Sequence, residues 1–501
     1  MTAGVEQLLS CLAARAVSQP QMDSVVSGAE TLSAGALWSR SGELAEWLRD
    51  HGVERLGLWA DNGIDWVLAD LACLRADICL VGLPTFFSAE QREYALTASG
   101  VDCLLLGPEA AEMLAGPSQT IQQASGLRQL VALELRECER SPLPSATGKI
   151  TFTSGSTGQP KGVCLSNAQC LAVAASLVDA VDCPGARHLS LLPLAVLLEN
   201  IAGLYRTLLA GGVVILPDPA DLGLSGSSGV HLPGFLWALE RWQPETLILV
   251  PEWLQGLDRA LAAGWRPPLS LRFVAVGGAR VAPALLQRIR DRGLPVYEGY
   301  GLSECASVVS LNTPAADRPG SSGRPLPHVH VSVEDGELVV AGNTFLAYLG
   351  ESPHPPHCPV RTGDIAELDA EGFVRIAGRR KHLLISSFGR NISPEWVESE
   401  LLAGGGLMQA VVLGDARPHC VALIWPADPR VSDAELEARV ARVNARLPDY
   451  ARVRRWARLP QPLSAQSGLL TGNGRLRRDR FAETYRSLIE RLYLPTEEMT
   501  A

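Results

Sequence analysis

The segment from 150 to 166, ITFTSGSTGQPKGVCLS, holds the side chains best suited to bind an oligophosphate. An apolar run leads into closely spaced hydroxyls and glycines and then a lysine, namely Thr153, Ser154, Gly155, Ser156, Thr157, Gly158 and Lys161. Hydroxyls and glycine N–H groups at this spacing can surround phosphate oxygens, and the lysine adds a point charge. The spacing is not that of the P-loop, which disfavours a Walker-type NTPase. A flexible surface turn is the alternative, but it leaves unexplained why one of only three lysines lies here.

This loop resembles the signature loop of the adenylate-forming superfamily, which includes acyl-CoA synthetases, nonribosomal peptide adenylation domains and luciferases. Further segments resemble the family's motifs in the right order: VAVGGARV (274–281), YEGYGLSE (297–304), RTGD (361–364), GRRKHLLISSFGRNISPEWVE (378–398) and LLTGNGRLRR (469–478). Ordered motifs over nearly the whole chain make a chance match negligible.

The resemblance implies an enzyme that activates a carboxylic acid with ATP, releases pyrophosphate and passes the acyl group to a second acceptor. A carboxylate is a poor electrophile, and attached AMP gives it a leaving group. The transfer needs charge neutralisation along the phosphates, which fits the loop from Thr153 to Lys161 and a Mg²⁺ ion at Glu304. The implied cofactors are ATP and Mg²⁺, with coenzyme A or phosphopantetheine as the acceptor.

The resemblance also implies how the nucleotide is bound. The glycine-rich strand end lines the adenine, Tyr300 stacks on it, and Asp364 and Arg379 contact the ribose. Outside the phosphate loop, the implied nucleotide-binding residues are Gly277, Gly278, Ala279, Glu298, Gly299, Tyr300, Ser303, Asp364 and Arg379. Simpler roles stay open, because Tyr300 could be a core aromatic, Asp364 a turn cap and Glu304 a solvated acid.

The last two motifs supply a hinge and a catalytic cation. Lys381 resembles the hinge residue about which the C-terminal domain rotates between two half-reactions. Arg475 occupies the position of the family's catalytic lysine, although the flexible run 472–474 could shift this register by one residue. Arginine keeps the charge and can hold a carboxylate or phosphate bidentately, but it is bulkier. The expected catalytic residues are Arg475, Lys161, Glu304 and Thr153.

The segment from 191 to 212, LLPLAVLLENIAGLYRTLLAGG, resembles the family's acid-binding helix and the loop before it. Relatives often carry a histidine where this chain has Val196. The expected pocket residues are Val196, Leu197, Asn200 and Gly203, which indicate a hydrophobic acid, fatty or aryl. A plain core helix is the alternative for the leucines. No aspartate for an α-amino group is identifiable.

Charge bears on the acceptor and the partners. The net charge of −10 argues against a nucleic-acid partner. The segment from Arg430 to Arg480 is nevertheless basic, with twelve arginines and five acidic residues. A basic C-terminal part suits coenzyme A or an acidic acyl carrier protein, and it could also be a solvated helical surface. An amine acceptor is also open. No long insertion of the fatty acyl-AMP ligase kind is evident near residues 320 to 350, which favours an acyl-CoA synthetase.

Composition and the start of the chain indicate a cytoplasmic protein. Eleven cysteines lack CxxC spacing, and the first residues have no basic region typical of a secretory signal. The longest apolar stretch, 191–216, is interrupted by Glu199, Asn200 and Arg206, so no transmembrane segment is expected.

The elements that position these residues are those of an α/β protein. Short apolar strands alternating with helical patterns predict layered parallel sheets; the strands are expected at 53–60, 78–84, 101–107, 213–217, 246–251 and 272–278. Hairpins at 329–342 and 364–378 predict a β-rich part. We expect an N-terminal AMP-binding domain (1–378, with 319–378 β-rich) and a smaller mobile α+β C-terminal domain (379–501), with the hinge near 381.

Three functions remain open at this stage. The first is an acyl-CoA synthetase-like ligase, and the second is an adenylate-forming enzyme that serves a carrier protein or an amine. The third is a catalytically weakened relative that binds a nucleotide or an acyl-adenylate, and Arg475 is the feature that keeps it open.

Overall fold

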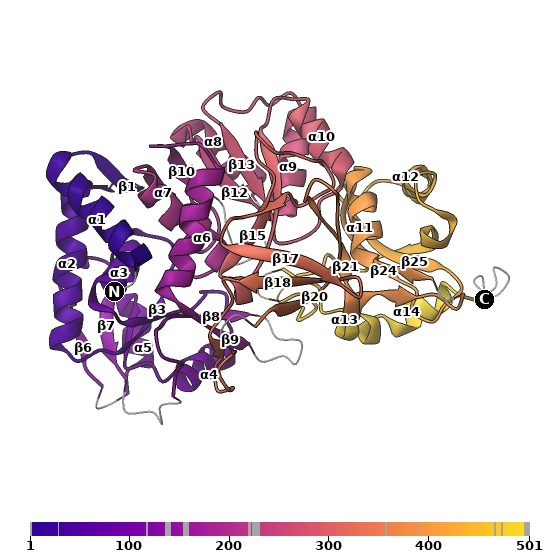
Figure 1. Ribbon diagram of the computed structural model, residues 1–501. Coiled ribbons are helices and arrows are strands. Elements are labelled where there is room, and N and C mark those ends of the chain that lie inside the picture. Colours follow the sequence, from indigo (N-terminus) through magenta and orange to yellow (C-terminus); the bar gives the residue numbers. More distant parts are fainter. Residues whose placement is uncertain are drawn as a thin grey trace.

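The computed structural model describes residues 3–494, apart from residues 29, 117–118, 136–141, 154–159, 219–221, 223–230, 356–357, 389, 465–466 and 472–473. A large N-terminal domain contains two mixed sheets, and a smaller C-terminal domain follows it, drawn in orange to yellow (Figure 1). This is the α/β architecture that the sequence predicts.

The first large sheet has nine strands, parallel through its centre and antiparallel at both edges. Its order is β16 (Arg324–Pro325), β15 (Ser307–Leu311), β14 (Val296–Leu302), β13 (Phe273–Val276), β12 (Thr246–Leu249), β10 (Arg187–Leu189), β11 (Val213–Leu216), β1 (Asp23–Ser27) and β2 (Glu30–Ser33). β11 and β12 are buried along their whole length, which explains their unbroken apolar sequences.

The second large sheet has eight strands with the same design, a parallel interior and antiparallel edges. Its order is β19 (Ala347–Tyr348), β9 (Lys161–Ser166), β8 (Thr147–Thr153), β4 (Cys79–Gly82), β3 (Arg55–Trp59), β5 (Cys103–Leu106), β7 (Val131–Glu134) and β6 (Ile121–Gln122). Both sheets are therefore parallel where the sequence predicts it, and the antiparallel edge strands are additions that the pattern does not distinguish.

Helices pack between and around these sheets. They are α1 (Ala3–Ser18), α2 (Ala34–Asp50), α3 (Ile64–Ala76), α4 (Ala89–Ser99), α5 (Pro108–Leu114), α6 (Asn167–Ala180), α7 (Arg206–Leu209), α8 (Leu232–Trp242), α9 (Pro251–Ala262) and α10 (Pro283–Arg290). Both α3 and α6 contact strands of the two sheets, and the largest apolar cluster joins them. No helix in the described part of the chain is both long and apolar enough to span a membrane.

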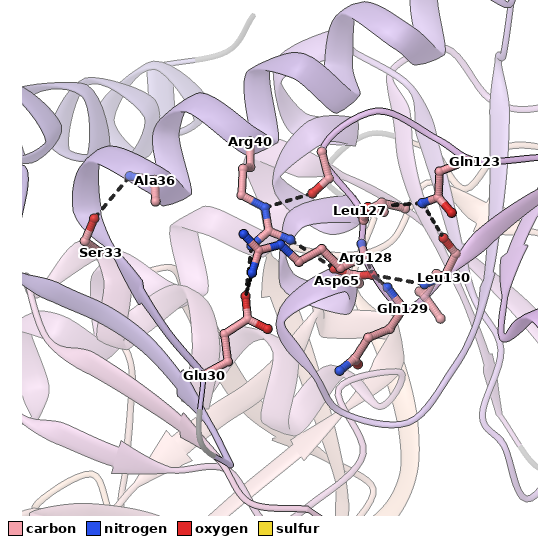
Figure 2. A network of polar contacts seen from close by, with 11 residues as sticks. Glu30, Ser33, Ala36, Arg40, Asp65, Gln123, Leu127, Arg128, Gln129 and Leu130 are labelled. Carbon is pink, nitrogen blue, oxygen red and sulfur yellow. Dashed lines mark hydrogen bonds and ion pairs between the residues drawn. The ribbon is translucent and has the colours of Figure 1, made fainter.

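A polar network holds helices α2 and α3 to the loop before β7 (Figure 2). On α3, Asp65 accepts hydrogen bonds from the backbone N–H groups of residues 128, 129 and 130 at 2.6–3.0 Å. On α2, Arg40 donates to the carbonyl of Gly126 at 2.8 Å and pairs with Glu30. The network ties the loop before β7 to two helices, so its role is structural.

A four-stranded antiparallel sheet forms the β-rich part of the chain. Its order is β17 (Val329–Glu334), β18 (Glu337–Gly342), β20 (Val360–Leu368) and β21 (Val374–Arg379). The turn between β17 and β18 has positive φ at both Asp335 and Gly336, as a two-residue hairpin turn requires. Both predicted hairpins are present.

The C-terminal domain packs helices on a sheet in the order β24, β25, β26. Its elements are β22 (Leu384–Ile385), β23 (Asn391–Ile392), α11 (Pro394–Ala403), β24 (Leu407–Leu413), β25 (Cys420–Pro426), α12 (Asp433–Asn444), β26 (Val453–Arg458), α13 (Arg478–Thr484) and α14 (Arg486–Arg491). One face of the sheet packs on α11 and α12 and the other on α13 and α14, forming two apolar clusters.

Candidate active site

The β8–β9 hairpin carries the predicted phosphate loop at its tip. Thr153, the last residue of β8, lies directly across from Lys161, the first residue of β9. The predicted phosphate-binding residues Ser154, Gly155, Ser156, Thr157 and Gly158 lie outside the described residues. The hairpin therefore holds both flanks of the loop in fixed register.

A tyrosine that the sequence motifs do not include joins the phosphate loop to the predicted metal ligand. The hydroxyl of Tyr348 donates to Glu304 Oε1 at 2.8 Å. Lys161 Nζ lies 3.7 Å from the centre of the Tyr348 ring and 3.0 Å from Glu351 Oε1. Burial, with the neighbouring Glu304 charge, raises the pKa of Tyr348 above its usual range, so the hydroxyl stays protonated as a donor.

Glu304 fits the predicted Mg²⁺ ion. It lies on a short 3₁₀ turn after β14, with Ser303, and is half-buried. Within the described part of the chain Lys161 pairs with Glu351, and no cation pairs with Glu304. No group of three or more His, Cys, Asp or Glu side chains suited to a metal occurs there either. A single hard carboxylate oxygen suits Mg²⁺, which commonly takes its other ligands from phosphates and water.

Tyr300 on β14, Asp364 in the middle of β20 and Arg379 at the end of β21 form one cluster. The Tyr300 hydroxyl donates to Asp364 Oδ2 at 2.6 Å, and Arg379 Nε lies 2.8 Å from Asp364 Oδ1. Burial raises the pKa of Asp364, and the charge of Arg379 opposes this shift. Each carboxylate oxygen keeps a second lone pair, so Asp364 can still accept from ribose hydroxyls.

The predicted adenine-binding turn follows β13. Gly278 has φ +87° and, with Ala279, is exposed, while Gly277 packs against the carbonyl of Gly299 on the neighbouring strand. The carboxyl of Glu298 is buried beneath the turn and accepts from the N–H of Val281 at 3.4 Å. Burial raises the pKa of Glu298 to about 7. Its side chain thus supports the turn, and its backbone carbonyl accepts from the N–H and the side-chain amide of Asn312.

Arg475 comes from the C-terminal domain and lies among these residues. The N–H of Thr471 donates to the carbonyl of Arg475 at 2.7 Å, and the N–H of Arg475 donates to Thr471 Oγ1 at 3.1 Å. Burial and the charge of Arg379 lower its pKa, while Asp364, Glu304 and Tyr300 oppose this shift. The Arg475 side chain nevertheless keeps a solvent-exposed surface. The alignment of Arg475 with the family lysine is therefore consistent with the fold.

The predicted acid-binding helix is a π-helix, Leu198–Tyr205, a form often found at functional sites. Of the four predicted pocket residues, Leu197 and Asn200 line a small cavity together with Trp66, Leu80, Gly82, Lys149, Ile150, Thr151, Leu194 and Ala195. Val196 and Gly203 do not line it. A Cβ on Gly203 would lie 2.3 Å from Glu199 Oε1, so glycine makes room for the buried Glu199–His188 pair.

Asn200 belongs to a buried polar network. Lys149 Nζ contacts Asp70 Oδ1 at 2.8 Å, Asn200 Oδ1 at 2.6 Å and the Tyr205 hydroxyl at 3.0 Å. Asn200 in turn donates to Asp70 Oδ2 at 2.7 Å. The network joins α3, β8 and the π-helix. It gives Lys149 a structural role as the cation that pairs with the buried Asp70.

Lys381, the predicted hinge, lies in a short exposed 3₁₀ turn directly after β21. Its neighbour His382 bonds Glu395 Oε1 at 2.7 Å, and Arg478 bridges Glu395 and Glu398. Burial alone would raise the pKa of Glu395, but the His382 and Arg478 contacts hold it at about 2. These contacts fix the turn after Lys381 to the start of α13, three residues beyond Arg475.

Comparison with known proteins identifies the family. Residues 12–349 match the model of the AMP-binding enzyme family, and residues 381–497 match that of the AMP-binding enzyme C-terminal domain. The chain belongs to the AMP-binding enzyme family. The resemblance to the adenylate-forming superfamily is thereby confirmed.

Among AMP-binding enzymes, similar curated relatives include CoA ligases. A feruloyl-CoA synthase from an Amycolatopsis species is 31% identical over 464 residues, covering 85% of this chain and 90% of the relative. A 2-succinylbenzoate–CoA ligase from Bacillus subtilis (strain 168) is 29% identical over 424 residues, covering 80% and 83%.

Solved structures of the fold include two with acyl-adenylates. An anthranilate CoA ligase in complex with anthranoyl-AMP has a TM-score of 0.79 at 18% identity, covering 96% of this chain and 98% of that one. The o-succinylbenzoate CoA synthetase from Bacillus subtilis, in complex with its acyl-adenylate intermediate, has a TM-score of 0.75 at 25% identity, covering 94% and 97%.

Proposed function

We propose that this chain is an AMP-forming acid–CoA ligase, which converts a hydrophobic carboxylic acid to its acyl-adenylate and then to its thioester. The observation that carries the proposal is the bonded cluster of Tyr300, Asp364 and Arg379, together with Arg475 of the C-terminal domain, whose charge interacts with Asp364 and Glu304. These residues come from distant parts of the chain and two domains. A folding role alone does not require two guanidinium groups and two carboxylates from two domains to interact.

In the first half-reaction an oxygen of the acid attacks the α-phosphorus of ATP, and pyrophosphate leaves. Thr153 and Lys161 hold the phosphates together with the loop between them, and Tyr348 orients Glu304. A Mg²⁺ ion at Glu304 would neutralise phosphate charge as the bond breaks. Arg475 bridges the acid and the phosphates, and Asp364 with Arg379 holds the ribose. In the second half-reaction a thiolate attacks the acyl carbonyl, and AMP leaves.

For the acid, an aryl acid is the first candidate. The cavity beside the acid-binding helix is small and mainly apolar, and the polar Lys149 network closes one side of it. The mainly apolar lining fits a hydrophobic acid, and the cavity would have to widen to admit either a ring or an alkyl chain. The feruloyl-CoA synthase relative, which acts on an aryl acid by its name, supports the same class.

For the acceptor, coenzyme A is the first candidate and a pantetheinyl acyl carrier protein the second. The arginine-rich segment from Arg430 to Arg480 favours either one. Within the described residues, Arg442 and Arg446 on and after α12 have no acidic partner, so the segment keeps unneutralised charge. Thioester formation with coenzyme A and with a phosphopantetheinylated carrier, measured at equal thiol concentration, separates the two.

Acid-dependent exchange of labelled pyrophosphate into ATP tests the proposal. The panel comprises hydroxycinnamic and benzoic acids, medium and long fatty acids, acetate and amino acids. We expect exchange with aryl acids above all others and none with amino acids. A protein that binds ATP but shows no exchange with any acid would instead be the catalytically weakened binding relative.

We also propose that the domain boundary lies between residues 378 and 379, with Lys381 as the hinge of a mobile C-terminal domain. The end of β21 at Arg379 and the start of the second family match at residue 381 support this boundary.

A further inference from the structure

Helix α11 of the C-terminal domain ends against helix α10 of the N-terminal domain. Arg288 Nη2, on α10, donates to the carbonyl oxygen of Ala403, the last residue of α11, at 3.0 Å. Asp258 on α9 lies 2.9 Å from the same Nη2 and keeps the guanidinium in place. Because the last carbonyls of a helix lack partners within the helix and carry partial negative charge, Arg288 caps α11 across the domain boundary.

The side chain of Ala403 adds an apolar contact between the two domains at the same place. Ala403 is only 4% exposed and belongs to the apolar cluster of the first large sheet, which includes Leu285, Leu286 and Ile289 of α10. Its neighbours on α11, Val397 and Leu401, belong instead to the core of the C-terminal domain. The burial of Ala403 therefore depends on how the two domains are arranged and not on the folding of either one.

The contact lies close to the nucleotide turn. Helix α10 begins two residues after Val281, where the turn 277–281 ends. In that turn, Arg280 donates to the carbonyls of Ile376 and Ala377, and the charges of Glu395 and Glu400 on α11 act on it. The same arrangement of domains places Arg475 beside Asp364 and Glu304.

We propose that Arg288 and Ala403 are positioning residues for the adenylation half-reaction, which hold the C-terminal domain where Arg475 meets the acid and the phosphates. The inference rests on the proposed function and goes beyond it, because neither residue touches the cleft. If the domain turns for thioester formation, both contacts must break. Removing them therefore slows adenylation and spares acyl transfer.

The chain offers a matched pair of variants. Arg288→Met keeps an unbranched apolar stem and removes the guanidinium that makes the cap. Arg292→Met is the control, because Arg292 also pairs with Asp258, at 3.1 Å, and contacts no C-terminal residue in the described part of the chain. Ala403→Arg adds bulk and a like charge at the contact and leaves the core of its own domain intact.

Two half-reactions are measured for each variant, pyrophosphate exchange and thioester formation from preformed acyl-adenylate. We expect exchange to fall about five- to tenfold in Arg288→Met, as loss of one charged hydrogen bond predicts, and further in Ala403→Arg. Thioester formation should stay at or above the wild-type rate. The Arg292→Met variant should match wild type in both. Unchanged exchange in Ala403→Arg, or an equal fall of both half-reactions, would overturn the proposal.

Amide hydrogen exchange with ATP present gives a readout that needs no chemistry. Peptides covering α10 and α11 should lose protection in Arg288→Met and Ala403→Arg and keep it in Arg292→Met. If the wild type turns over no acid, the proposed function fails, and this measurement still decides on the contact. Equal protection in all four proteins would contradict it.

Discussion

Arg475 is the residue on which the proposed chemistry most depends. It supplies positive charge where an acid carboxylate and the ATP phosphates would meet, opposite Glu304 and Asp364. This arginine-rich chain keeps lysine at 149, 161 and 381. We therefore infer that arginine at position 475 is compatible with the site and is not only a result of composition.

Arg475→Ala should lower the rate of adenylation about 10²- to 10³-fold, because the charge on the forming and breaking bonds loses a stabilising cation. Acyl transfer from preformed acyl-adenylate should change far less. Arg475→Lys should retain or raise the adenylation rate. Stopped-flow measurement of both half-reactions checks this. Unchanged adenylation in Arg475→Ala would move the role to a neighbour such as Arg477.

Glu304→Gln should slow adenylation about 10²-fold or more while the protein stays folded, since the side chain lies at a cleft and not in a core. The variant should also need a higher Mg²⁺ concentration for half-maximal rate. Glu371→Gln is the control, because Glu371 is exposed and pairs with Arg318, which has no role in the site. Wild-type exchange activity in Glu304→Gln would remove this residue from the site.

Sequence motifs could predict most of the side chains that the fold brings together around Glu304 and Asp364. Recognition of phosphate and ribose requires definite residue types, and these occur in a fixed order along the chain. Tyr348 had no such signal. Its role depends on β19 pairing with β9, a contact between segments nearly two hundred residues apart. Asn200 and Gly203 were expected in an acid pocket; Asn200 lines the small cavity and also bonds Asp70, whereas Gly203 lies against Glu199.

Among the elements, the turn after β13 owes its shape to a buried acid. Burial shifts the pKa of Glu298 from its ordinary 4.5 to about 7, so the folded protein favours the protonated form. This contribution to stability is fully present below pH 4.5 and is lost as pH rises through 7. Glutamine has no charge to bury. The advantage of Glu298→Gln over wild type should therefore grow by about 3 kcal/mol between pH 4.5 and 8.

Chemical denaturation of both proteins across this pH range measures that difference. The glutamine keeps an acceptor for the N–H of Val281, so loss of the hydrogen bond does not confuse the result. A stability difference that is independent of pH would show that Glu298 is ionised in the folded protein.

The strand that leads into the phosphate loop is anchored by Lys149. Lys149→Met leaves Asp70 as a buried charge without its cation and should lower the free energy of unfolding of the N-terminal domain by about 3–5 kcal/mol. Adding Asp70→Asn removes the second charge and should restore part of the loss. Urea unfolding of the single and double variants checks this. A single variant as stable as wild type would mean that the pair adds nothing to the fold.

The elements themselves could be predicted where burial is symmetric. Strands such as β4 and β5 are covered on both faces, so their sequences are continuously apolar and easily recognised. Short edge strands such as β6, β16 and β19 have two residues each, too few to show any periodicity. Whether such a strand is parallel or antiparallel depends on the strand beside it, and the two become neighbours only in the folded chain.

For the whole molecule, the proposal requires two arrangements of the domains about Lys381. Lys381→Pro should leave pyrophosphate exchange within about twofold of wild type and lower thioester formation about tenfold or more, because proline fixes φ at the pivot. Lys381→Ala, which keeps φ free, should affect neither half-reaction. Equal loss of both in the proline variant would mean that residue 381 is merely structural.

The central claim is that acid activation proceeds through an adenylate. The most direct test supplies ATP, Mg²⁺, coenzyme A and the preferred aryl acid, and then quantifies all products by chromatography and mass spectrometry. The account predicts AMP, pyrophosphate and acyl-CoA in equal amounts, with acyl-adenylate accumulating when coenzyme A is omitted. Acid-dependent release of ADP and orthophosphate would contradict it.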